Sequence, residues 1–159
     1  MGAWGYKALE SDEGLDVVDF MSEYISKKPE QQIELTLSEL VASMKVDGFF
    51  GKNFDEIEFF YDHSAMALAE LYFNFQDNGE LEYDNEYEHR NLRKRIKSFT
   101  ADKISLEFLR QYLVDIRDEK PEKYGGREIV ELWRESKDWD NWKANLMFLI
   151  ERLEKEIKK

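Results

Sequence analysis

The sequence predicts an all-α protein, a single compact domain of five to six helices around a central apolar helix at about residues 54–77. Apolar residues recur at steps of three and four along most of the chain, which is typical of helices with one buried face. Only two prolines, Pro29 and Pro121, interrupt this spacing. Hydrophobic residues make up 42% of 159 residues, enough for one core, so we expect residues 1–159 to form one α-helical domain.

Two helices are expected before the central one. Ser11 has the side chain of an N-cap, and the helix that it starts must end before Pro29. The sequence Thr36-x-x-Glu39 is typical of a capping box and predicts a second helix that ends at Gly48.

The central helix is expected to begin at Asn53, which has Glu56 three residues later, and to end at Asn78-Gly79. Apolar side chains fall on all of its sides. A helix of this kind is buried on most sides, so we expect the other helices to pack around it.

Three further helices complete the chain. Thr100 can cap a long helix, a short helix follows Gly125-Gly126, and the last helix starts near Asp138 and runs to the end. The tryptophans of the last two helices are interpreted as core residues, with an exposed partner site or a dimer seam as the alternative. They are Trp133, Trp139 and Trp142.

Composition excludes several classes of function. With 23 basic and 35 acidic residues the chain carries a net charge of −12, which disfavours nucleic acid and anionic membranes as partners. There is no cysteine, which removes disulfides, thiolate zinc sites and cysteine nucleophiles. Uncharged runs are far shorter than the roughly 20 residues that span a bilayer, and no signal peptide is recognisable, so we expect a cytoplasmic protein.

The stretch from Asp77 to Glu88 holds six acidic residues and no basic one. Tyrosines within a negative patch suit recognition of a basic protein, because carboxylates steer the encounter and aromatic rings anchor it. The alternative is a charged loop that only keeps the protein soluble. The candidate partner-binding residues are Glu82, Tyr83, Asp84, Glu86 and Tyr87.

A second candidate site lies on the central helix, where Glu58, Asp62 and His63 could supply an acid and a base. The favoured interpretation is a polar strip that faces water. Glu56, His63 and Glu70 share one stripe, but a seven-residue step rises about 10.5 Å, too far for one ion. No catalytic, cofactor-binding or metal motif occurs, so we expect no enzyme activity, no cofactor and no metal.

The first residues carry a distinctive motif. Met1–Gly5 reads Met-Gly-Ala-Trp-Gly, and Glu10, Asp12, Leu15 and Asp16 follow around the first helix start. This segment resembles the N-terminus of an uncharacterised family of small acidic bacterial proteins, a domain of unknown function. The match covers about the first 20 residues.

Five positions of this segment depart from the family, and two of them, Tyr6 and Lys7, stand where small residues are common. Leu9, Ser11 and Gly14 replace the usual Phe, Asn and Ala. The resemblance implies a bacterial cytoplasmic protein with no assigned activity. If the motif is a site, Trp4, Glu10, Asp12 and Asp16 form it; the favoured alternative is a Trp tucked under a capped helix.

These observations favour a noncatalytic protein-binding module, such as an immunity or antitoxin-like factor for a basic partner. A small-ligand-binding protein or a hydrolase that uses Glu58, Asp62 and His63 is the alternative. A self-associating structural protein is a third hypothesis, so a homo-oligomer stays open.

Overall fold

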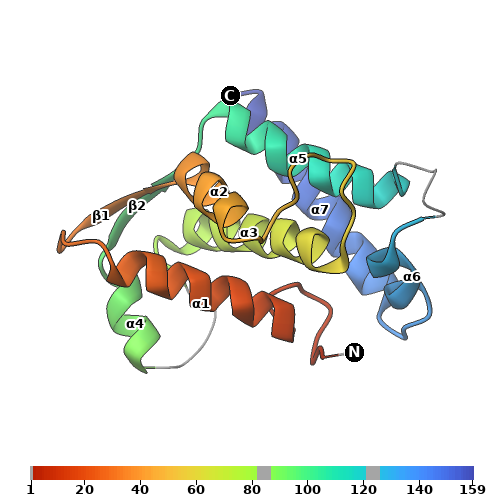
Figure 1. Ribbon diagram of the computed structural model, residues 1–159, viewed down its shortest axis with the longest axis horizontal. Helices are drawn as coiled ribbons and strands as arrows, with labels where there is room; N and C mark the ends of the chain where they lie inside the picture. Colours follow the sequence, from red (N-terminus) through yellow and green to blue (C-terminus); the bar gives the residue numbers. More distant parts are fainter. Residues whose placement is uncertain (1, 82–86, 121–125) are drawn as a thin grey trace.

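A computed structural model describes residues 2–81, 87–120 and 126–159, and the fold is mainly helical (Figure 1). The prediction of a mainly helical protein is confirmed, although the described ranges contain seven helices rather than five or six. The elements are α1 (Asp12–Ser26), β1 (Ile33–Thr36), α2 (Leu37–Val46), α3 (Phe59–Asn78), α4 (Tyr87–Arg93), β2 (Ile96–Thr100), α5 (Lys103–Asp118), α6 (Glu128–Arg134) and α7 (Trp139–Ile157).

Helix α3 is the central element, as the sequence predicted. It lies between α1 on one side and α2 and α5 on the other, and it also contacts α6 and α7 (Figure 1). Every residue from Asp62 to Phe73 is buried. Contact on all sides therefore explains why apolar residues occur all round this helix, as expected.

The predicted start of α3 is wrong by six residues: the helix begins at Phe59 rather than at Asn53. The Asn53 side chain instead accepts a hydrogen bond from the Asp55 backbone N–H (2.9 Å), and Glu56 accepts one from the Lys52 N–H (3.0 Å). Both side chains bind the backbone of their own loop, which competes with helix formation.

Other helix ends match the sequence signals. The Ser11 hydroxyl accepts a hydrogen bond from Gly14 N–H (3.0 Å), and the Thr36 hydroxyl accepts one from Glu39 N–H (3.2 Å). Gly79 ends α3 in the left-handed conformation (φ 73°), which glycine adopts without strain.

The predicted cap of α5 is wrong. Asp102, not Thr100, caps this helix, and its carboxylate accepts a hydrogen bond from Ser105 N–H (2.8 Å). Thr100 instead ends β2, where it pairs with Thr36 of β1.

A small parallel sheet of β1 and β2 was not predicted. Leu35 pairs with Phe99 in its interior, and both side chains are buried. Strands of four and five residues carry too little alternation to be recognised from sequence, and a bulge after Ile33 disturbs the register further.

The tryptophans of α6 and α7 stack on one another. Trp133 and Trp142 are buried with ring centroids 6.1 Å apart, and Trp139 stacks on Trp142 at 5.7 Å. The core interpretation of Trp133 and Trp142 is confirmed, while Trp139 is only partly buried.

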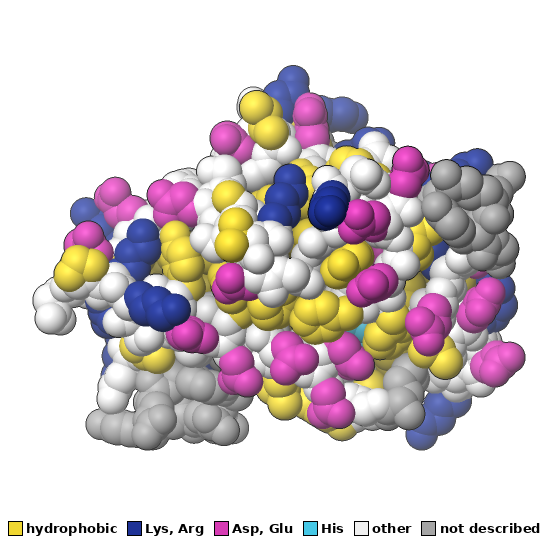
Figure 2. All heavy atoms as spheres, viewed as in Figure 1, with side chains coloured by type: hydrophobic (Ala, Val, Ile, Leu, Met, Phe, Trp, Pro, Cys, Tyr) yellow, Lys and Arg dark blue, Asp and Glu magenta, His cyan; other side chains and the backbone are white. Residues whose placement is uncertain are grey.

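Acidic side chains gather across the lower right of the face in Figure 2. They lie beside yellow apolar surface, whereas basic side chains concentrate toward the upper and left parts of this face. In the described parts of the chain, no helix combines the length and apolar character needed to cross a membrane.

Candidate functional site

The N-terminal segment folds back on itself and presents the first candidate site. Trp4 N–H donates to the Glu10 carbonyl (3.0 Å), and Asp12 N–H donates to the Gly2 carbonyl (2.7 Å). A single antiparallel bridge lies between these two bonds. Residues 2–12 therefore form a closed turn that leads directly into α1.

Glu70, from the middle of α3, ties this turn to the core. Its buried carboxylate accepts hydrogen bonds from Ala8 N–H (2.8 Å), Leu9 N–H (3.0 Å) and the Asn145 side chain of α7 (3.0 Å). Burial raises the pKa of Glu70, and these three donors oppose the rise. The turn is thus held at its ends by its own backbone hydrogen bonds and between them by Glu70 of α3.

A cleft of about 630 Å³ opens between this turn, α3 and α7; we name it the Trp4 cleft. The Trp4 indole is 60% exposed and the Phe148 ring 55% exposed, and both line the cleft together with Glu10 and Glu70. Exposed aromatic rings in a concave site are typical of binding surfaces.

A basic side chain also lines this cleft. Arg152 donates two hydrogen bonds to the Asp77 carboxylate (2.7 and 2.8 Å). Its guanidinium lies 4.2 Å from the centre of the Phe73 ring and 5.7 Å from that of Phe148. The wall formed by α3 and α7 therefore already holds one cation between a carboxylate and aromatic rings.

The four residues predicted from the N-terminal motif are separated by the fold. Trp4 and Glu10 line the same cleft, whereas Asp12 and Asp16 lie exposed on the first turns of α1 and do not line it. The expectation that Trp4 tucks under the first helix is wrong. Ala8 is the residue of this turn that is buried in the core, while the Trp4 indole is left 60% exposed.

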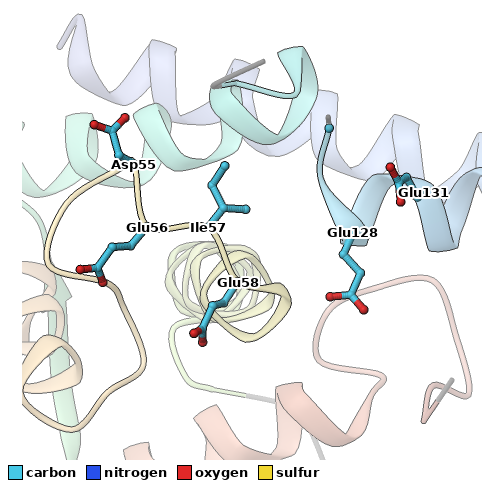
Figure 3. A pocket seen from close by; sticks show the side chains of 7 residues that line it. Asp55, Glu56, Ile57, Glu58, Glu128 and Glu131 are labelled. Carbon is cyan, nitrogen blue, oxygen red and sulfur yellow. The ribbon is translucent and has the colours of Figure 1, made fainter. Parts of the chain in front are cut away.

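A second concavity of about 560 Å³, the acidic cleft, lies between the loop before α3 and α6 (Figure 3). Five carboxylates line it and no lysine or arginine does, within the described residues. They are Asp55, Glu56, Glu58, Glu128 and Glu131. In Figure 3 the side chains of Glu58 and Glu128 approach the cleft from these two different segments.

Beneath this region lies a buried ion pair. Arg127, the residue before α6, donates from Nη1 to Oδ1 of Asp62 in α3, and each side chain is only 1% exposed. The Arg127 Nε and Nη2 donate to the Lys120 carbonyl (3.0 and 2.6 Å). Burial raises the pKa of Asp62 to about 6 even though Arg127 opposes the rise.

His63 is buried as well, with its ring 4.7 Å from that of Phe59. Burial lowers its pKa to about 4, so the imidazole is neutral at neutral pH. The expectation that Asp62 and His63 face water with Glu58 is therefore wrong, because only Glu58 is exposed. No three His, Asp or Glu side chains in the described ranges are arranged to hold a metal ion.

The candidate partner-binding residues of the acidic run lie outside the described residues. This holds for Glu82, Tyr83, Asp84 and Glu86, while Tyr87 begins α4 and its side chain is not described. A basic run, Arg90 to Lys97, follows the acidic one in the sequence, and its residue Arg95 stabilises the fold. It donates to the carbonyls of Ile25 (3.2 Å) and Lys28 (2.6 Å), at the carboxyl end of α1.

Sequence reasoning missed the residues that shape both clefts, namely Glu70, Arg127, Phe148 and Arg152. Glu70 did carry a usable signal, since it is the single charged residue between Ala65 and Phe75. A charge in the middle of a helix that is buried on all sides must find hydrogen-bond partners. The other three have no such local signal.

Fold and site together define a mainly helical protein whose described surface includes an aromatic cleft and an acidic cleft. The chain matches the family described as domain of unknown function DUF4259 over residues 2–145. Because this match covers most of the chain, the protein belongs to that family, in agreement with the resemblance seen at its N-terminus. No curated protein and no solved structure matches significantly.

Proposed function

We propose that this protein is a noncatalytic binding module for a basic partner protein, of the kind to which immunity and antitoxin factors belong, acting in the bacterial cytoplasm. The acidic cleft carries the proposal. It gathers five carboxylates around one concavity without a basic residue among its described lining, in a chain of net charge −12. Such a surface raises the rate of encounter with a cationic partner.

The burial of Asp62 and His63 supports the noncatalytic part of the proposal. A general acid or base must come within hydrogen-bond reach of its substrate. Both side chains are 1% exposed, and Asp62 is bound to Arg127. The hydrolase alternative therefore requires an opening of the structure before any substrate meets these groups.

A charge-reversal pair tests the acidic cleft. In one variant Glu58, Glu128 and Glu131 become Lys; in its control, three exposed acids elsewhere become Lys, namely Asp19, Glu34 and Glu151. Each substitution adds two charges, so both variants move from −12 to −12 + 6 = −6. Overall charge is thereby matched, and only its location differs.

The wild-type protein is first used to capture proteins from a lysate of its source organism at low and high salt. We expect a basic protein that is released at high salt, with an association rate about tenfold lower or more for the cleft variant than for the control. Equal rates for the two variants with every captured partner would contradict the acidic cleft as the binding surface.

The acidic run is tested in the same assay. Reversal of Glu82, Asp84 and Glu86 to Lys changes the net charge by the same amount, and Tyr83 with Tyr87 would supply the aromatic anchors. A slower association for this variant would extend the binding surface to the run. An unchanged rate and salt dependence would leave the run as a solubilising segment.

A further inference from the structure

We propose that the Trp4 cleft binds a small organic cation, an ammonium group that carries methyl or methylene groups, between the Trp4 indole and the Glu10 carboxylate. This site is separate from the acidic cleft and takes a small molecule rather than a protein. Its volume of about 630 Å³ lies within the range of roughly 300–1,000 Å³ found for small-molecule sites.

The wall of the cleft already shows the required chemistry with a cation of the chain itself. Arg152 lies 4.2 Å from the centre of the Phe73 ring and is bound by both oxygens of Asp77. A cation is favourable there because the ring face is electron-rich and the carboxylate supplies the opposite charge.

Trp4 and Glu10 again provide an aromatic ring and a carboxylate, but no cation of the described chain lies on the ring. The backbones of the two residues are paired, since Trp4 N–H donates to the Glu10 carbonyl (3.0 Å), and both side chains line the cleft. The Glu10 carboxylate accepts one hydrogen bond, from the Lys7 backbone N–H (3.2 Å). Within the described residues, no lysine or arginine stacks on the Trp4 indole, which is 60% exposed. Indole is the aromatic ring that attracts cations most strongly.

The inner wall adds a carboxyl group, that of Glu70. Glu70 is 8% exposed, lines the cleft, and accepts hydrogen bonds from the backbone N–H groups of Ala8 and Leu9 and from the Asn145 side chain. Among residues 2–81, 87–120 and 126–159, no lysine or arginine forms an ion pair with this carboxyl group within 4.0 Å. A bound organic cation would therefore contact the electron-rich face of the Trp4 indole and the acceptor oxygens of Glu10 and Glu70.

Lys7 is the opposing group. It lines the cleft and lowers the pKa of Glu70 through its charge. Its ammonium must repel a bound cation and attract a bound anion. Substitution of Lys7 thus reports the sign of the ligand's charge.

The test uses two probes of the same shape, choline and its neutral isostere 3,3-dimethylbutan-1-ol, titrated into the full chain by calorimetry. We expect saturable binding of choline and binding at least about fivefold weaker for the isostere, the range that one cation–π contact provides. Equal binding of the two probes, or no saturable binding of choline, would overturn the proposal.

Variants locate the site. Trp4→Ala and Glu10→Gln should each weaken choline binding by about fivefold to thirtyfold, and Lys7→Gln should strengthen it. Ile104→Ala, at another exposed apolar position, is the control and should bind choline like the wild type. Circular dichroism confirms that each variant is folded.

Two results would contradict the proposal. One is choline binding that Trp4→Ala leaves unchanged; the other is a Lys7→Gln variant that binds choline more weakly than the wild type. Neither depends on a protein partner, so failure here is distinguishable from failure of the acidic cleft.

Discussion

Asp62 and Arg127 form an ion pair that joins α3 to the segment before α6, with both side chains withdrawn from water. The pair connects the central helix to one wall of the acidic cleft, because Gly126 and Glu128 flank Arg127 and line that cleft. The geometry of the cleft therefore depends on an interaction beneath its surface.

Asp62→Asn should destabilise the protein by about 3–5 kcal/mol, because it leaves the Arg127 charge buried without a counterion. Asp77→Asn, which breaks the more exposed pair with Arg152, should cost less than about 1 kcal/mol. Urea unfolding at neutral pH measures both free energies. Similar losses in the free energy of unfolding for the two variants would show that burial does not set the strength of the ion pair between Asp62 and Arg127.

Asp62 and His63 should oppose each other in the pH dependence of stability. Between pH 4 and 6 the folded protein keeps the Asp62 proton that the unfolded chain has lost, because its pKa is raised from 3.8 to about 6, so this contribution falls as pH rises. The unfolded chain keeps the His63 proton, because the folded pKa is lowered from 6.5 to about 4, so that contribution grows as pH rises.

His63→Gln removes the contribution of His63 to the pH dependence of stability. The contribution of Asp62 should then become visible. Relative to the wild type, the variant should lose about 3 kcal/mol of stability as pH rises from 4 to 6.5. Asp62→Asn should show the opposite drift. Urea unfolding across this pH range measures the differences, and parallel curves for wild type and His63→Gln would refute the buried, neutral histidine.

Gly14→Ala should destabilise the protein, although alanine favours helices over glycine by about 1 kcal/mol. A Cβ at this position of α1 would lie 2.1 Å from the Ala8 carbonyl oxygen, which the N-terminal turn presses against the helix. We expect a loss of about 1–3 kcal/mol. The exposed position Asp19→Ala is the control, and a more stable Gly14→Ala variant would place the turn elsewhere.

Glu70→Gln should loosen the N-terminal turn while α3 stays folded. An amide has a single acceptor oxygen, so it cannot accept from Ala8 and Leu9 through two oxygens as the carboxylate does. Hydrogen exchange at these two amides should accelerate about tenfold or more, with exchange in α3 unchanged. Protection equal to that of the wild type would mean that the backbone bonds alone hold the turn.

The elements with local causes were predictable from sequence. Ser11, Thr36 and Gly79 act through bonds or dihedral angles within a few residues, so their signals survive in the chain itself. Asn53 shows the limit of such signals. The same side chain can cap a helix or close a turn, and packing of the following loop decides between them.

The site was predictable only in part for the same reason. Trp4 and Glu10 were identified by the N-terminal motif, but their cleft is completed by Phe148 and Arg152 from the other end of the chain. The burial of Asp62 depends on Arg127, 65 residues away. The residue pattern within one segment does not predict which side chains of distant segments come into contact.

The parallel strands also constrain the order of folding. β1 and β2 join Ile33 to Ile96, so 96 − 33 = 63 positions of chain, including α2 and α3, must be brought into a closed loop before their hydrogen bonds form. Loop-closure entropy makes such contacts late. Phe99→Ala should thus accelerate unfolding and leave the refolding rate nearly constant. The contacts of the sheet would then set the unfolding rate, and with it the lifetime of the native state.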